Sequence, residues 1–286
     1  MNDPVVLVSA ARTPMGSFQG DFSSLAAHDL GGVAIAAAVQ RAGISPDLVT
    51  EVLFGNCLMA GQGQAPARQA AFKGGLPKSA GAVTLSKMCG SGMRAAMFAH
   101  DMLLAGSHDV LVAGGMESMT NAPYLMLKGR GGYRLGHDRL FDHMMLDGLE
   151  DAYEPGRSMG TFGEDCAAKY SFTREAQDRF ATTSVQRAQA ATKSGAFAAE
   201  IAPVTVKTRA GETVLMPSRI EPRRRSQRGL WWAAGIAVLL GNRIEFVATY
   251  FAALRCGIVV LPLNTAYTAH EVHDLVTRSS ARMLVT

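Results

Sequence analysis

The residues best suited to chemistry surround one cysteine, Cys89, in the stretch "SKMCGSGMRAAMFAH" at 86–100. Gly90, Ser91 and Gly92 follow the cysteine directly, and an apolar run typical of a helix follows them. The start of a helix favours the thiolate form of a nearby cysteine, and the thiolate is the nucleophile. Small neighbours let a bulky thioester approach the backbone. The pattern therefore favours nucleophilic catalysis, whereas a cysteine judged by itself is more often a buried core residue.

The remaining cysteines indicate neither a metal site nor a redox pair. Cys57, Cys166 and Cys256 are widely separated in the sequence, and no two cysteines form a C-x-x-C motif. The N-terminus lacks the positive charge and long apolar run of a signal peptide. The longest apolar run, at 230–240, is too short to cross a bilayer. We expect a cytoplasmic protein with reduced thiols.

The charge of the chain gives no indication of a nucleic-acid partner. The 286 residues carry a formal net charge of +4, with 48% hydrophobic and 18% charged residues, a composition typical of a globular protein. The segment "RIEPRRRSQR" at 219–228 holds five arginines and one glutamate and accounts for the whole excess. A run of this kind is usually a solvated linker.

The elements around Cys89 alternate between strands and helices. Apolar runs predict strands at 4–10, 51–58, 82–88 and 109–116, and helical patterns lie at 23–43, 65–75 and 91–105. This alternation predicts an α/β fold with a mostly parallel sheet covered by helices. A glycine-rich stretch at 118–158 interrupts it, and an amphipathic helix follows, with Thr173 as N-cap and Gly195 as its stop.

Four ordered motifs resemble the thiolase family. They are "SAARTPMGSFQG" at 9–20, "GQAPARQAA" at 63–71, "KMCGSGMRA" at 87–95 and "VAGGMESMTNAPY" at 112–124. The similarity extends from about 4 to 217. It implies acyl transfer between coenzyme A thioesters through an acyl-Cys89 intermediate, without a metal or redox cofactor. It also implies a homo-oligomer with a five-layer αβαβα fold, of which this chain has the first half and a loop domain.

The resemblance also suggests substrate-binding residues in the loop domain. Leu149, in "DGLEDAY" at 147–153, matches a position that lines the coenzyme A site. Ser158 and Met159 stand where many relatives have His-Met, so Ser158 departs from the common form. Ordinary packing is the alternative role for Leu149 and Met159.

Two catalytic motifs of the family are absent from the printed sequence. No histidine precedes a proline, so there is no G-H-P motif for activating the nucleophile, and no cysteine lies in a C-x-G motif for moving the α-proton of the second substrate. Residues 232–286 instead resemble an early fragment of the adenylate-forming acyl-CoA ligases, a partial α/β segment without a phosphate-binding loop. We expect four parts: a thiolase core at 1–117, a truncated loop domain at 118–217, a basic junction at 218–231 and the ligase-like fragment at 232–286.

Two functions remain open at this point. The first is a thiolase-type acyltransferase that is incomplete because the second half is absent. The alternative is a non-catalytic truncated or chimeric gene product that at most binds coenzyme A. A ligase-type adenylating protein is the weakest of the possibilities. An acetyl adduct that forms after mixing with acetyl-CoA and is lost with Cys89→Ser would favour the first.

Overall fold

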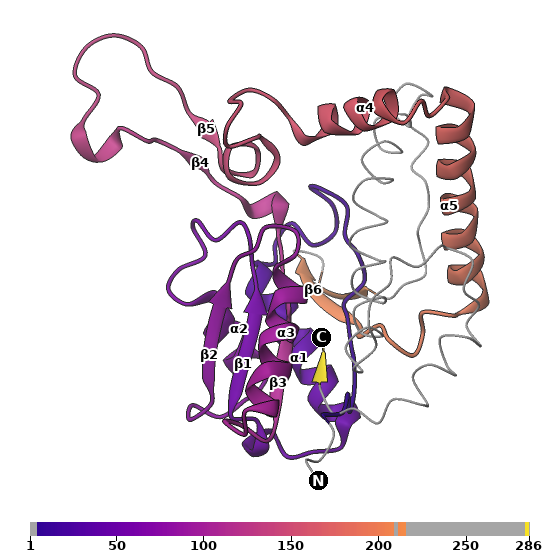
Figure 1. The fold of residues 1–286 in the computed structure, drawn as a ribbon. Coiled ribbons are helices and arrows are strands. Elements are labelled where there is room, and N and C mark those ends of the chain that lie inside the picture. The colour runs from indigo at the N-terminus through magenta and orange to yellow at the C-terminus, as the bar shows by residue number, and fades with distance from the viewer. Residues whose placement is uncertain (1–4, 209–210, 216–283, 286) are drawn as a thin grey trace.

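A parallel sheet forms the centre of the protein (Figure 1). The computed structural model describes residues 5–208, 211–215 and 284–285. Within them, the sheet has the strand order β2-β1-β3-β8. Its strands are β1 (Glu51–Gly55), β2 (Gly81–Leu85), β3 (Leu111–Gly115) and β8 (Leu284–Val285). All their pairings are parallel, which confirms the predicted fold class.

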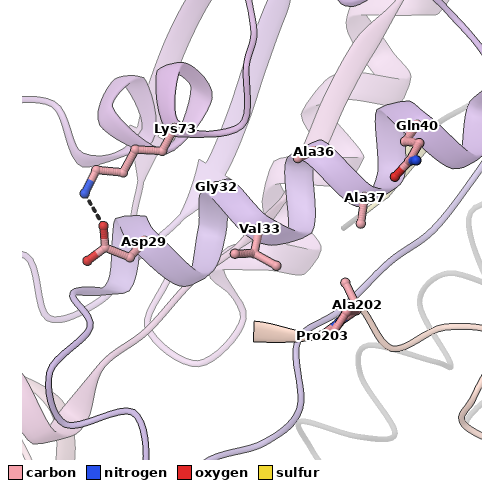
Figure 2. Close-up of a pocket in the computed structure, with 9 residues that line it drawn as sticks. All are labelled: Asp29, Gly32, Val33, Ala36, Ala37, Gln40, Lys73, Ala202 and Pro203. Atoms are coloured by element: carbon pink, nitrogen blue, oxygen red, sulfur yellow. Dashed lines mark hydrogen bonds and ion pairs between the residues drawn. The ribbon is translucent and has the colours of Figure 1, made fainter. Parts of the chain in front are cut away.

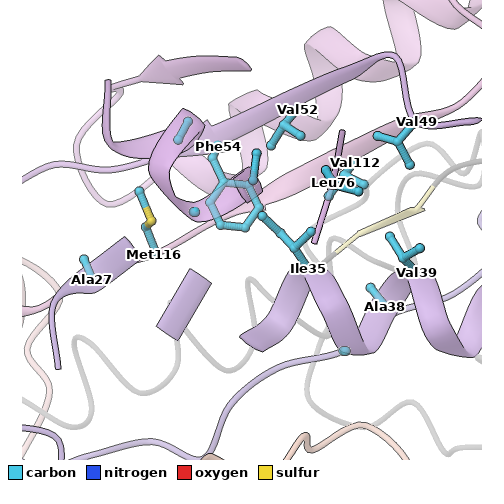
Figure 3. Close-up of a cluster of buried hydrophobic side chains, with 14 residues drawn as sticks. Ala27, Ile35, Ala38, Val39, Val49, Val52, Phe54, Leu76, Val112 and Met116 are labelled. Carbon is cyan, nitrogen blue, oxygen red and sulfur yellow. The ribbon is translucent and has the colours of Figure 1, made fainter. Parts of the chain in front are cut away.

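One face of the sheet is covered by two helices, α1 (Ala27–Ala42) and α2 (Pro66–Lys73). Val52 and Phe54 point to this face from β1, and Figure 3 shows Phe54 and Ile35 together in the resulting core. Both side chains are fully buried. Because alternate residues of a strand face opposite sides, the intervening Leu53 must serve the other face.

The other face is covered by α3 (Ser91–Leu104). Leu53 packs there against Ala95, Ala96 and Ala99, each of which is 0% exposed. Small side chains at this interface let the helix lie close to the sheet. We call this row of Ala95, Ala96 and Ala99 the alanine seam.

A close approach between backbones places the start of α3 on the sheet. A Cβ added at Gly55, the last residue of β1, would lie 2.4 Å from the backbone nitrogen of Gly92 and 2.7 Å from the Cβ of Ser91. Only glycine leaves that space open. The residues just before α3, including Cys89, are therefore held near the carboxyl edge of the sheet.

The remaining elements belong mainly to the loop region and its neighbours. A hairpin pairs β4 (Tyr124–Leu125) with β5 (Phe141–Asp142), and residues 126–140 between them project away from the body (Figure 1). Every residue of 126–140 is exposed. The other elements are 3₁₀-helices at Pro46–Leu48, Met119–Asn121 and Gly129–Gly131, a π-helix at Met145–Leu149, α4 (Met159–Lys169), α5 (Arg174–Ser194), β6 (Val204–Thr208) and β7 (Gly211–Leu215).

Several local predictions are confirmed and others are wrong. Thr173 caps α5 by accepting from the Ala176 N–H. Gly195 ends the helix in the left-handed conformation, with a φ of 74°. Residues 5–10 form isolated bridges and not the expected strand. α1 starts at Ala27 and not near Ser24, because the Asp29 carboxylate accepts the Ala26 N–H at 2.8 Å and fixes the helix start there.

Two of the four expected parts cannot be compared with the structure. The junction at 218–231 lies outside the described residues, as does the ligase-like fragment at 232–286 except for 284–285. Among the helices that are described, none combines the length and the hydropathy that a membrane span requires.

Candidate functional site

Cys89 lies in a turn between β2 and α3 and is exposed to solvent. Met88 in this turn has a φ of +48°, a left-handed conformation that is unusual for a residue with a long side chain. No side chain caps the first residues of α3. The cysteine therefore stands two residues before the first residue of a helix, with its side chain open to solvent. This is the position predicted from the sequence.

Ser91 connects the turn to the body of the protein. It is only 3% exposed, and its hydroxyl donates to the Met88 carbonyl at 2.5 Å and accepts the Lys87 N–H at 2.7 Å. Its oxygen also lies 3.6 Å from the sulfur of Cys57. One buried hydroxyl thus links the turn that carries Cys89 to the loop that follows β1.

A second polar group borders this loop at the carboxyl ends of β1 and β3. One carboxylate oxygen of Glu117 accepts the Cys57 N–H at 2.8 Å, and the other accepts the Leu58 N–H at 3.0 Å. The buried side chain of Asn56 donates to Glu117 at 2.7 Å. Three donors converge on one carboxylate, which fixes the first residues of the loop.

The pKa values of both titratable groups in this cluster are raised. Burial raises the pKa of the Cys57 thiol to about 12. The hydrogen bond with Ser91 opposes this shift, and the charge of Glu117 adds to it. Partial loss of water raises the pKa of Glu117, although the Cys57 and Leu58 N–H groups oppose the shift. Much of the Glu117 side chain faces solvent, but its oxygens are turned toward the protein donors. Cys57 is therefore a poor nucleophile at neutral pH.

His143 attaches the loop region to the same cluster. It is 5% exposed, and its Nε2 lies 3.3 Å from the backbone nitrogen of Ala60, which must donate to it. The proton of the neutral ring is then on Nδ1, which donates to the Asp147 carboxylate at 2.6 Å. Asp147 belongs to the π-helix at Met145–Leu149, so this pair anchors that helix beside the loop after β1.

The three predicted loop-domain residues are brought together. Leu149 ends the π-helix, Ser158 precedes α4 and Met159 begins it. An antiparallel bridge between Glu150 and Ser158 joins the two segments, and all three predicted residues are partly buried. Gly148 packs against Leu58 in the loop after β1, and Ser91 links that loop to the Cys89 turn. The three residues are therefore connected to Cys89 through this loop.

A separate hollow lies along the outer side of α1 (Figure 2). Gly32, Val33 and Ala36 contribute small apolar surfaces to it, and Figure 2 shows the ion pair between Asp29 and Lys73 at one end. None of the residues that line it belongs to the Cys89 cluster. Its two charged lining residues, Asp29 and Lys73, pair with each other, so we do not consider it a catalytic site.

Four residues of this site were missed in the sequence: Asn56, Ser91 as a connecting residue, Glu117 and His143. One signal was available for two of them, since Asn56 and Glu117 each follow an apolar run, and the carboxyl ends of parallel strands meet at one edge of a sheet. No local pattern distinguishes His143 from the other histidines. Its partner Ala60 is 83 residues away.

Comparison with known families assigns most of the chain to one of them. The model of the thiolase N-terminal domain matches residues 5–226, and that of the AMP-binding enzymes matches 226–286. The second match is short and lies almost wholly outside the described residues.

Individual relatives agree with the first match. Acetyl-CoA acetyltransferase of Cupriavidus necator is 48% identical over 210 residues, covering 73% of this chain and 53% of the relative. Acetyl-CoA acetyltransferase 2 of Arabidopsis thaliana is 52% identical over 202 residues, covering 71% and 50%. The chain thus spans about half the length of these relatives. The solved structure of acetyl-CoA acetyltransferase from Syntrophomonas wolfei is similar with a TM-score of 0.72 and 37% identity, covering 81% of this chain and 58% of that one.

Proposed function

The chain belongs to the thiolase family, and from this premise we propose that it accepts acyl groups from coenzyme A thioesters on Cys89. The observation that carries the proposal is the setting of Cys89. It is an exposed thiol in a fixed turn at the start of α3, close to the carboxyl edge of a parallel sheet. Thioesters of coenzyme A are the proposed substrates, and no metal or redox cofactor is part of the proposal.

The first half of the reaction needs only this nucleophile and a thioester. The Cys89 thiolate attacks the carbonyl carbon, and the resulting tetrahedral oxyanion collapses as the carbon–sulfur bond to coenzyme A breaks. Coenzyme A leaves as a thiolate and takes a proton from solvent, and an acyl-Cys89 thioester remains. N–H groups near the start of α3 are suitable donors to the oxyanion.

We further propose that Leu149, Ser158 and Met159 line the path of the coenzyme A arm. The bridge between Glu150 and Ser158 gathers them on one surface, and the contact of Gly148 with Leu58 joins that surface to the loop beside the Cys89 turn. The partly buried side chains of Leu149 and Met159 suit the methylene and methyl groups of the pantetheine arm, and the Ser158 hydroxyl suits its amides.

The second half of the reaction requires a base that removes the α-proton of another acyl-CoA. The family motif for that step, C-x-G, does not occur in the printed sequence. We therefore propose acyl transfer to Cys89 as the activity of the chain by itself, and full thiolase turnover and a homo-oligomer only for a complete family member. The same absence favours the alternative proposal, a protein that binds coenzyme A without catalysis. We propose no separate activity for 226–286.

Intact-mass spectrometry after mixing with acetyl-CoA tests the first proposal. The expected result is one acetyl group per chain, absent in Cys89→Ser and retained in the matched control Cys166→Ser, which removes another exposed thiol. Peptide mapping should place the adduct on Cys89.

The alternative gives a different outcome in the same samples. If acetyl-CoA binds in a calorimetric titration but no adduct forms, the chain is a coenzyme A-binding protein without acyl transfer. If neither binding nor adduct occurs with a folded sample, both proposals are wrong.

A further inference from the structure

The turn that carries Cys89 has a conformation that its own residues do not favour. Met88 adopts a φ of +48°, which costs free energy for any residue with a Cβ unless the surroundings hold it in place. Two backbone hydrogen bonds close the turn, from Gly90 to Lys87 at 3.1 Å and from Ser91 to Met88 at 3.0 Å. A turn of this kind can relax unless a further contact fixes it.

The hydroxyl of Ser91 supplies that contact. It accepts the Lys87 N–H at 2.7 Å on one side of Cys89 and donates to the Met88 carbonyl at 2.5 Å. Both of the residues that precede the nucleophile are therefore tied to the first residue of α3. Since the hydroxyl has one proton, which goes to Met88, the third contact must come from the Cys57 thiol, at 3.6 Å.

The hydroxyl itself is held rigidly. Ser91 is 3% exposed, and its Cβ faces Gly55 at the end of β1, where the backbones of strand and helix approach most closely. The side chain therefore has little freedom to move. It therefore fixes the turn relative to the sheet.

From this geometry we propose that Ser91 is a positioning residue for the Cys89 nucleophile, an inference that rests on the proposed acyl transfer. Its two short backbone hydrogen bonds keep Met88 left-handed and hold the sulfur where a bound thioester can reach it. The contact with Cys57 is longer and does not contribute to positioning. Ser91 touches neither the sulfur nor the substrate in this role.

Single-turnover acetylation of the full chain tests the proposal, with Ser91→Ala as the variant. The maximal acetylation rate should fall by about 10- to 100-fold, because misplacement of a reacting group by about 1 Å has effects of this size. The half-saturating concentration of acetyl-CoA should stay the same, because Ser91 does not contact the substrate. Alkylation of Cys89 by iodoacetamide, which needs no bound geometry, should change much less than acetylation.

Two controls isolate the hydrogen bonds. Cys57→Val removes the thiol contact but leaves both backbone bonds of Ser91, and it should acetylate at the wild-type rate. Ser86→Ala removes an exposed hydroxyl in the same segment and should also have no effect. Ser91→Ala with an unchanged maximal rate would overturn the proposal, as would equal losses of acetylation and alkylation.

Folding and the prior proposal are tested separately. Should Ser91→Ala fail to fold, Met88→Gly is added, because glycine accepts a positive φ without a supporting hydroxyl. Because the proposal gives Ser91 the task of keeping residue 88 left-handed, a folded double variant with a maximal rate close to wild type supports it, and a folded double variant with a maximal rate reduced about 10-fold or more contradicts it. If the wild-type chain forms no adduct, acyl transfer itself fails. Relaxation measurements on the Met88 and Cys89 amides then decide the positioning role, and unchanged mobility in Ser91→Ala contradicts it.

Discussion

At the scale of single residues, two cysteines lie in different surroundings, although residue type alone does not distinguish them. Cys89 is exposed in its turn, whereas Cys57 is partly buried between Ser91 and Glu117. The local pattern around Cys89 was sufficient to predict that this cysteine precedes a helix, because small residues and a following apolar run are visible in the sequence. The setting of Cys57 was not predictable, because its contact with Ser91 spans 34 residues.

The first prediction concerns the order in which the thiols react. With limiting iodoacetamide at pH 8, Cys89 should be labelled well before Cys57. The raised pKa of Cys57, about 12, keeps its thiol protonated at this pH, and its labelling should increase as the pH approaches that value. Mass mapping of labelled peptides measures the order, with exposed Cys166 as a reference. Cys57 labelled first would show that its surroundings are more open.

At the scale of elements, α1 and α2 are joined by an ion pair at their ends. The Asp29 carboxylate, which also caps Ala26, pairs with Lys73 in the last turn of α2. Burial favours the neutral acid, but the hydrogen bonds from Lys73 and the Ala26 N–H outweigh it and lower the pKa of Asp29. The pair thus holds two helices of one layer together.

The second prediction follows from that pair. Asp29→Asn should lower the free energy of unfolding by about 1–2 kcal/mol at pH 7, because it removes the charged hydrogen bond with Lys73 and leaves only a neutral acceptor for the Ala26 N–H. A carboxyl whose pKa is lower in the folded state stabilises the fold at pH values above its unfolded pKa of 3.8. This stabilisation is lost as the pH falls through the folded pKa. The two proteins should therefore converge once the pH falls below the folded pKa of Asp29. Urea titrations measure this, with Asp21→Asn as an exposed control. A difference that persists at low pH would contradict the ion-pair explanation.

A third prediction concerns the alanine seam between α3 and the sheet. Ala96 is 0% exposed and packs beside Leu53 and Ala113, so Ala96→Leu must displace its neighbours. The expected loss is about 1–3 kcal/mol of unfolding free energy. Met97→Leu, at the next residue and 43% exposed, is the matched control and should change stability by less than about 0.5 kcal/mol. Equal effects of the two substitutions would show that the seam is not closely packed.

The predictability of the elements followed the strength of their local patterns. The strands β1, β2 and β3 and the helices α1, α2, α3 and α5 all appeared in the apolar periodicity. The hairpin of β6 and β7 was not predicted, although valines and polar residues alternate in β6, because β7 has no such alternation and four of its five residues are exposed. The π-helix was also missed, since the His143 contacts that anchor it come from tertiary structure. α4 was missed because Gly160 and Gly163, in its first turns, are poor helix formers.

At the scale of the whole molecule, apolar side chains remain exposed on the body that carries Cys89. Met97 and Phe98 on α3 are 43% and 39% exposed, and Val83 on β2 is 46% exposed. β2 is an edge strand of the described sheet. Exposed apolar surface and unpaired strand edges both favour association.

The fourth prediction is that the purified chain elutes as an associated species. Val83→Lys combined with Phe98→Ser should shift the population toward the monomer, because lysine on an edge strand discourages pairing and serine removes apolar surface. Size-exclusion chromatography with light scattering measures the mass. Phe172→Ser, which removes a more exposed ring elsewhere, is the control. A sharp monomeric peak for the unaltered chain would contradict the prediction.

The projecting segment between β4 and β5 has a consequence for protease susceptibility. Residues 126–140 are all exposed and include Lys128, Arg130, Arg134 and Arg139, each a potential trypsin site. Opening such a segment locally costs little free energy, so trypsin should cut there before it reaches the sheet. The fragments should nevertheless stay together. Arg12 bonds to Glu200 and Arg41 bonds to the carbonyl oxygens of Glu200 and Ile201, which ties the two sides of the cut to each other. A nicked chain could then keep its Cys89 turn intact.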